Sequence, residues 1–256
     1  MPTKKMFGLN LGQKLSSAER REVLENLFVF NKTDQKPFLY RMATLLVIST
    51  IIATCGLLSN SAAVVIGAML VAPMMRPVMA AAAAITLAWP KHFTESLLLV
   101  VIMAISAIAI SIAMTALGPH MFSIPSQVLA RTQPTFFDLV IALAAGSGGA
   151  YTMTRKESSA IPGVAMAVAL LPPLASAGIL IVFAEFGLAT KAMVLFITNF
   201  FAMILAGSLT FIATGARPTG MFSKYPKIIP AFVLLFTILV GTVSVPLFYY
   251  SQDNLV

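Results

Sequence analysis

Arg76 is the residue whose type and position carry the most chemistry in this sequence. It lies in the run Ala72-Pro-Met-Met-Arg-Pro77, inside an apolar segment long enough to cross a bilayer. A charged side chain near the bilayer centre costs about 2.5–3.5 kcal/mol on insertion scales, so it is paired or faces a cavity. Two interpretations follow. Arg76 either attracts an anionic solute or takes part in a gating pair, or it belongs to a structural ion pair, for which Asp138 and Glu95 are candidate partners although both lie near span ends.

Prolines interrupt two apolar segments in the same pattern. Pro73 and Pro77 lie in the first, Pro172 and Pro173 in the second, and Gly163 follows Gly67 after 96 residues, as Pro173 follows Pro77. Proline within a helix frees backbone carbonyls, which hydrocarbon cannot satisfy, so such breaks occur where protein or a water-filled cavity supplies partners. The pattern predicts broken helices and a site between two related halves, as in secondary transporters.

Polar side chains at membrane depth give further candidate ligands. Asn199 lies in the middle of an apolar segment beside Thr198. It either binds solute or forms an interhelical hydrogen bond worth about 1 kcal/mol. Hydroxyl and amide groups near the breaks either contribute ligands or satisfy backbone groups. They are Asn60, Ser61, Ser147, Ser158, Ser159 and Ser176.

The composition places the chain among polytopic membrane proteins. Hydrophobic residues make up 59% and charged residues only 10%, so most of the chain cannot face water. The net charge of +8 follows from topology in this interpretation, and we expect no nucleic-acid partner. The single cysteine, Cys55, excludes an intrachain disulfide framework and is expected to be a buried small residue. The polar N-terminal forty residues show no cleavable signal peptide.

Seven segments approach the roughly 20 apolar residues needed for a membrane span. They are Arg41–Leu58, Ser61–Leu87, Glu95–Leu117, Phe137–Met153, Ala160–Phe183, Thr190–Ala213 and Ile228–Tyr250. The fourth contains Ala144-Ala-Gly-Ser-Gly-Gly-Ala150, small residues typical of a close helix interface. The predicted fold class is therefore all-α, with about seven transmembrane helices.

Basic residues set the expected orientation. With the N-terminus in the cytoplasm, nearly all Lys and Arg residues of the loops lie inside, as the positive-inside rule requires. The inside set is Lys4, Lys5, Lys14, Arg20, Arg21, Lys32, Lys36, Arg41, Lys91, Arg155, Lys156, Arg217, Lys224 and Lys227, and the outside set is Arg131 and Lys191. Three crossings per unit then make the repeat an inverted one. If the proline segments were re-entrant hairpins, this symmetry would be lost.

The predicted organisation has five parts. Residues 1–40 form a cytoplasmic segment with an amphipathic helix, which lies either on the inner leaflet or on the protein's own loops. Residues 41–117 form the first three-helix repeat, 118–136 an outer loop and 137–214 the second repeat. Residues 215–256 hold a cytoplasmic loop, the seventh helix and a short outer tail.

Four motifs carry a resemblance to a known family. They are Ile66-Gly-Ala-Met-Leu-Val-Ala-Pro-Met-Met-Arg-Pro77, Ala130-Arg-Thr-Gln-Pro134 leading into Ala142-Leu-Ala-Ala-Gly146, Pro162-Gly-Val-Ala-Met-Ala-Val-Ala-Leu-Leu-Pro-Pro-Leu174, and Thr198-Asn199. Over about Arg41 to Thr214 the chain resembles the uncharacterised hydrophobic-domain membrane family called domain of unknown function 389, in a minimal membrane version. The resemblance implies a membrane protein and supplies no catalytic residue or substrate.

Enzymatic function is not expected from these motifs. The sequence contains no HExxH, GxSxG or P-loop, and its two histidines, His92 and His120, lie in loops assigned to opposite faces. We expect no cofactor and no metal. The sequence therefore predicts an inner-membrane transporter or channel for a small polar or anionic solute, working in lipid as a homo-oligomer. The alternative is a noncatalytic oligomeric scaffold or sensor.

Overall fold

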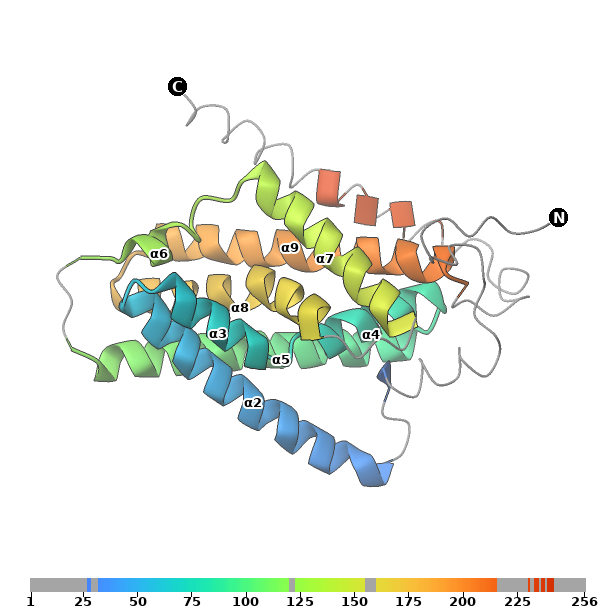
Figure 1. The fold of residues 1–256 in the computed structure, drawn as a ribbon, viewed down its shortest axis with the longest axis horizontal. Coiled ribbons are helices and arrows are strands. Elements are labelled where there is room, and N and C mark those ends of the chain that lie inside the picture. The colour runs from blue at the N-terminus through green and yellow to red at the C-terminus, as the bar shows by residue number, and fades with distance from the viewer. Residues whose placement is uncertain are drawn as a thin grey trace.

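The computed structural model is a bundle of helices that run roughly along one axis (Figure 1). It describes residues 27–28, 32–119, 123–154, 160–215, 230, 233–234, 236–237 and 239–241, with 32–35 and 160–168 as backbone only. No strand occurs in these ranges. The all-helical fold class is confirmed for this part of the chain. The predicted N-terminal amphipathic helix and most of the seventh span lie outside the described residues.

The first half contains four main helices. α2 spans Lys32–Leu58, α3 Ala62–Val71, α4 Met75–Thr86 and α5 Pro90–Leu117. α3 and α4 meet at an angle of 57° at Ala72–Met74, which is the geometry of a broken span or of a re-entrant loop, so the predicted break in this segment is confirmed. α5 begins five residues before the predicted Glu95, because Pro90 at its first position has a backbone preorganised for a helix start.

The second half contains a short helix and three long ones. α6 spans Ser126–Leu129, α7 Phe136–Thr154, α8 Ala160–Val182 and α9 Phe186–Ala213. The expected break of the fifth span is wrong, because α8 is a continuous helix through Pro172 and Pro173. α9 packs against α4, α7 and α8, and α8 also packs against α5.

Helix length and composition support a membrane protein. Within the described residues, α2, α5, α7 and α9 are long and apolar enough to cross a bilayer, and a fifth span is counted if α3 and α4 form one. Large apolar side chains of α5 are exposed, among them Val101, Ile105 and Leu117. Exposed apolar stripes of this kind suit contact with acyl chains.

The boundaries of the helices recur after 96 residues. α2 and α7 end at Leu58 and Thr154, α4 and α8 end at Thr86 and Val182, and α5 and α9 begin at Pro90 and Phe186. α5 and α9 also end in register, at Leu117 and Ala213.

The turns before α5 and α9 share the same backbone path. Ala88 and Ala184 have φ of 55° and 59°. The N–H of Trp89 donates to the carbonyl of Ala84 at 2.9 Å, and the N–H of Glu185 donates to that of Leu180, also at 2.9 Å. Both turns are Schellman motifs, in which a left-handed residue ends the helix.

Candidate functional site

Arg76 lies in the first turn of α4, directly after the bend in the second span. Its guanidinium carbon lies 4.4 Å from the centre of the Phe38 ring of α2, which is a cation–π contact. The α4 helix rises about 1.5 Å per residue, so Arg76 is about 15 Å from the α4–α5 link. The aromatic ring therefore holds the charge of this half-buried side chain away from the end of α4.

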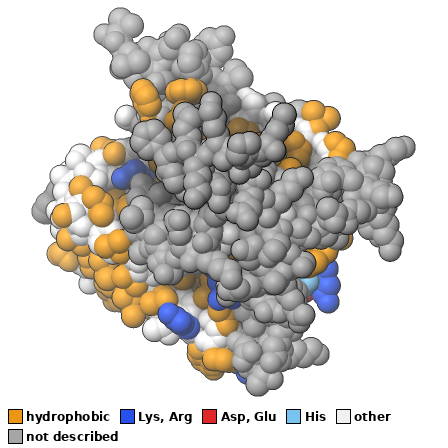
Figure 2. Space-filling view, turned by 45° about the vertical axis from the view of Figure 1, so that its right-hand side comes forward, with side chains coloured by type: hydrophobic (Ala, Val, Ile, Leu, Met, Phe, Trp, Pro, Cys, Tyr) orange, Lys and Arg blue, Asp and Glu red, His pale blue; other side chains and the backbone are white. Residues whose placement is uncertain are grey.

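A cavity of about 540 Å³ reaches Arg76 from the end of the bundle that carries the α4–α5 link. Cavities of about 300–1,000 Å³ are typical of small-molecule sites. We call it the Arg76 cavity. Its lining includes Phe38, Leu39, Arg76, Pro77, Ala80, Lys91, His92, Glu95, Ser96, Leu98, Leu99 and Ile102. Figure 2 turns this end forward and shows basic side chains near apolar flanks.

The two carboxylates proposed as partners of Arg76 have other partners. Glu95 accepts a hydrogen bond from His92 Nδ1 at 2.9 Å, and its second oxygen lies 4.0 Å from Lys91 Nζ. Asp138 accepts from the N–H of Thr135 at 2.8 Å and from its hydroxyl at 2.6 Å, which caps α7. Among the described residues, neither carboxylate forms an ion pair with Arg76, so the predicted pairing is wrong.

The positive charge of Arg76 is uncompensated within the described part of the chain. Its Nε is buried and has no hydrogen-bond partner there. The positive charge of Arg41 in α2 repels it. Its position in the first turn of α4 adds the partial positive charge of a helix N-terminus. The deep end of the Arg76 cavity is therefore electrostatically suited to an anion.

The aromatic side chains at the α4–α5 link support the mouth of the cavity. Phe28, Trp89 and His92 form a three-membered cluster with ring centroids 5.0–5.8 Å apart. His92 thus contacts both this cluster and Glu95, which fixes the first turn of α5 beside the opening.

Asn199 bonds to a carbonyl of α8 that a proline leaves without its helical partner. Proline at 173 has no N–H for the carbonyl of Ala169 four residues earlier. The side-chain amide of Asn199 in α9 donates to that carbonyl instead, at 3.0 Å. Asn199 therefore forms an interhelical hydrogen bond to the backbone, which is the second of the two roles expected for it. Its Oδ1 is buried without a partner among the described residues.

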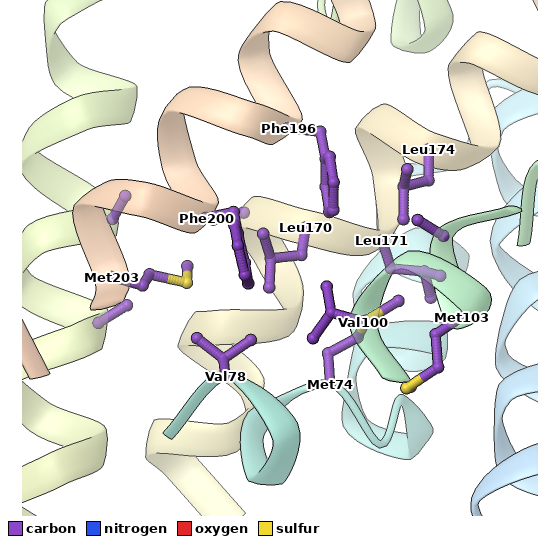
Figure 3. Close-up of a cluster of buried hydrophobic side chains, with 14 of the residues drawn as sticks. Met74, Val78, Val100, Met103, Leu170, Leu171, Leu174, Phe196, Phe200 and Met203 are labelled. Carbon is purple, nitrogen blue, oxygen red and sulfur yellow. The ribbon is translucent and has the colours of Figure 1, made fainter. Parts of the chain in front are cut away.

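The region where the two proline segments meet is apolar. α8 contacts both α3 and α4, so the predicted contact between these spans is confirmed. Figure 3 shows what fills this region: Met74, Val78, Val100, Met103, Leu170, Leu171, Leu174, Phe196, Phe200 and Met203. Pro172 and Pro173 are buried in this half. The expectation of a polar site between two unwound helices is therefore wrong, and the Arg76 cavity lies to one side of this core.

The other predicted site residues have mainly local roles or open surroundings. Ser61 caps α3 by accepting from the N–H of Val64 at 3.4 Å. Pro73 lies half-buried at the bend, Ser147 lies half-buried on α7, and a Cβ added at Gly67 would meet nothing within 4 Å. Gly163 lies in the part of α8 described only as backbone, and Ser158 and Ser159 lie outside the described residues.

Two further expectations concern single residues. Cys55 was expected to be buried and is exposed on α2, so that expectation is wrong. The small-residue run in α7 was expected at a close helix interface, which is confirmed at Gly146, where an added Cβ would lie 2.5 Å from the carbonyl oxygen of Met203 in α9.

A second arginine lies at the opposite end of the bundle. Arg131 follows α6, and its Nε is buried without a partner among the described residues. Burial lowers the pKa of this guanidinium, and the negative charge of Asp138 acts in the other direction.

Several cavity residues were not identified from the sequence. Lys91 and His92 had been assigned to a loop, and Phe38 to the segment before the first span. The sequence could have indicated the residues from α5, because His92, Ser96 and Leu99 follow helical spacing along one face of this helix. In the described part of the chain, no group of three His, Cys, Asp or Glu side chains is placed to hold a metal ion.

The long apolar helices of the bundle are those of a helical membrane protein by length and composition. In the comparison with known families, residues 69–205 match the model described as a domain of unknown function, DUF389. The chain belongs to the DUF389 family. It is 32% identical over 180 residues to an uncharacterized protein of Methanocaldococcus jannaschii, an alignment that covers 70% of this chain and 56% of the relative. The chain thus spans little more than half of that relative's length. No solved structure matches the chain.

Proposed function

We propose that this protein is a membrane transporter for a small anionic solute, which Arg76 binds at the inner end of its cavity. The observation that carries the proposal is an arginine in a cavity wall with no carboxylate partner among the described residues. A guanidinium matches carboxylate and phosphate geometry, and a charge at this depth needs a counter-charge. In this proposal the protein works in lipid as a homo-oligomer, without a cofactor, a nucleic-acid partner or catalytic chemistry.

An inverted repeat is the architecture we propose for this transport. The matched helix ends and the matched turns at Ala88 and Ala184 support two related units of three spans. In Figure 1, α5 runs from right to left whereas its counterpart α9 runs from left to right. Units that run in opposite directions are the arrangement on which many secondary transporters are built.

Two contacts between the units also involve positions that are equivalent after 96 residues. A Cβ added at Gly178 of α8 would lie 2.7 Å from Ser111 Cβ of α5, and one added at Gly207 of α9 would lie 3.2 Å from Ala82 Cβ of α4. Ala82 and Gly178 are equivalent positions, as are Ser111 and Gly207. The two contacts are thus images of one another, which supports a two-fold relation between the units.

Access to the proposed site is from one end in this structure. The Arg76 cavity opens beside the α4–α5 link, and the apolar core of Figure 3 fills the region where the proline segments meet. We place the cavity mouth on the cytoplasmic side of the inner membrane, because the positive-inside rule favours that side for Lys91 and the N-terminal segment. Rocking of one unit against the other would then open the opposite side.

A scaffold or sensor role is the second candidate. The dry core between the proline segments and the stacking of Arg76 on Phe38 favour it, since both would also stabilise a static bundle. The two functions differ in whether the cavity binds a solute that moves across the membrane.

Anion uptake into proteoliposomes under imposed ion gradients tests the proposal, with chloride, phosphate and acetate as probes. We expect Arg76→Gln to lower uptake at least tenfold and Arg76→Lys to keep part of it, because the charge persists. Lys36→Gln is the matched control, since this exposed lysine of α2 does not line the cavity. Size-exclusion chromatography verifies assembly. Wild-type uptake by a well-assembled Arg76→Gln variant, or no uptake of any probe by the wild type, would overturn the proposal and favour the scaffold.

A further inference from the structure

We infer that the second unit contains a closed counterpart of the Arg76 cavity, located between α7, α8 and α9 and lined by Ser176 and Thr198, which opens when α8 bends before Pro172. This inference rests on the proposed function, because it assigns the residues that a transported anion meets at the other end of the bundle. The evidence for it is that two buried polar side chains occupy positions 96 residues after residues that line the Arg76 cavity.

The register places cavity residues of the first unit on specific residues of the second. Ala80 and Ile102 line the Arg76 cavity, and their equivalents are Ser176 and Thr198. The exposed fraction of Ile102 is 52%, whereas that of Thr198 is 2% and that of Ser176 is 0%. The equivalent region of the second unit is therefore packed shut.

Burying the Ser176 hydroxyl costs free energy that no hydrogen bond among the described residues of the closed structure offsets. Its Oγ has no hydrogen-bond partner among the described residues although the side chain is fully buried. A buried hydroxyl without a partner costs about 1–3 kcal/mol, and such exceptions call for an explanation. Ala80 at the equivalent position carries no polar group. A state in which Ser176 faces solute or water supplies the missing partner.

The difference between the units lies in the second span of each. The first unit is bent at Ala72–Met74, and the equivalent residues 168–170 of α8 remain helical. The Asn199 amide bond to the Ala169 carbonyl lies within that stretch and stabilises its continuous helical form. Breaking it would let α8 bend where its counterpart does.

The first spans of the two units, α2 and α7, also differ in how closely they pack against the bundle. In the second unit, Gly146 brings α7 against the backbone of Met203 in α9. In the first unit, the N-terminal half of α2 leans away from the bundle (Figure 1), and Tyr40 on it is 76% exposed. The first unit is thus open beside α5, and the second is closed beside α9. Exchange of these two forms closes the Arg76 cavity and opens its counterpart.

The ligand class of the closed cavity is the same small anion. Ser176 supplies a hydroxyl donor, which binds an anion more weakly than a guanidinium does, whereas the Thr198 hydroxyl donates to the Val194 carbonyl at 2.9 Å and would have to leave that bond to contribute. Weaker binding on this side suits release of the solute that Arg76 captures.

Cysteine labelling with a membrane-impermeant thiosulfonate tests the inference, in a Cys55→Ala background of the full chain. Ser176→Cys is compared with Ala175→Cys, its equally buried neighbour, whose equivalent Met79 does not line the Arg76 cavity. We expect Ser176→Cys to react at least tenfold faster than Ala175→Cys, and from the side opposite to that which labels Ala80→Cys. Adding Asn199→Ala should raise the Ser176→Cys rate and lower the Ala80→Cys rate.

Two results would overturn the inference. One is a Ser176→Cys that stays as unreactive as Ala175→Cys while Ala80→Cys reacts. The other is equal reaction of Ser176→Cys and Ala175→Cys, which indicates general loosening. Neither depends on the Asn199→Ala variant folding. Anion uptake measured in the same background keeps the proposed function separate, since uptake that depends on Arg76 can persist when Ser176→Cys is inert.

Discussion

The amide of Asn199 donates a hydrogen bond to the carbonyl of Ala169, thirty residues earlier in the chain. That carbonyl is the one deprived of its helical partner by Pro173. A side chain of α9 therefore repairs the backbone of α8, and a proline that would otherwise favour a kink lies inside a continuous helix. A contact between helices thus supports the continuity of the helix at this proline.

Loss of this bond should destabilise the bundle. We expect Asn199→Ala to lower the free energy of unfolding in detergent by about 1–2 kcal/mol, the range for interhelical bonds in membranes. Thr210→Val is the control, because the Thr210 hydroxyl donates only within its own helix, to Ala206. Equal stability of the two variants in denaturant titrations would contradict this role.

The close approach of α7 and α9 predicts a sharp difference between two glycines. Gly146→Ala should destabilise by about 1–3 kcal/mol, because its Cβ would meet the Met203 backbone and overpack the interface. Gly148→Ala should be tolerated, since a Cβ there meets nothing within 4 Å. Thermal unfolding followed by size-exclusion chromatography measures both. Similar melting temperatures would show that α7 packs differently.

The aromatic contact of Arg76 should contribute to anion affinity. Phe38→Leu keeps the apolar volume but removes the ring, so the guanidinium loses its fixed position. We expect anion affinity to fall about twofold to fivefold, which corresponds to about 0.5–1 kcal/mol for a partly exposed cation–π pair. Isothermal titration with the anion transported best measures it. The apolar change Leu209→Ala, at an exposed position away from the cavity, should leave affinity unchanged.

The carboxylate in the cavity wall should weaken anion binding. Glu95→Gln removes a negative charge from the lining, so affinity for the anion should rise and KM for uptake should fall at low ionic strength. Glu185→Gln makes the same change at an exposed residue of the opposite end and should leave KM unchanged. A rise in KM for Glu95→Gln would mean that Glu95 acts by holding His92 rather than through its charge.

Two equivalent threonines provide a test of the inverted arrangement. Thr94 and Thr190 occupy the same position in the first turns of α5 and α9, and both are exposed. In a Cys55→Ala background, an impermeant maleimide should label Thr94→Cys only from the cytoplasmic side and Thr190→Cys only from outside. Labelling of both from one side would exclude an inverted repeat.

Local signals in the sequence were sufficient for most of the helices. Apolar length predicted the positions of α2, α5, α7, α8 and α9, and Pro73 with Pro77 predicted the bend between α3 and α4. Their ends were less well predicted, because α9 begins at Phe186 after a left-handed turn at Ala184 that lacks the usual glycine.

Only part of the site was predicted, because its residues come from helices that are far apart in the sequence. Arg76 was identified because a charge in an apolar segment is conspicuous by itself. Its partner ring, Phe38, comes from α2, and Lys91 and His92 of the cavity lining come from the first turn of α5. Likewise, the partner of the Ala169 carbonyl in α8 is Asn199 of α9. No single-segment pattern encodes which of these side chains meet, because helix packing brings them together.

The left-handed alanines before α5 and α9 offer a practical route to a more robust sample. An alanine in this conformation costs about 1–2 kcal/mol that glycine avoids. Ala88 and Ala184 hold it at matched positions, each secured by the same pair of backbone hydrogen bonds. Glycine at both places would remove strain without touching the cavity or the core. Such a variant is a suitable starting point for detergent screening and for cryo-electron microscopy, where survival of the extracted protein limits what can be seen.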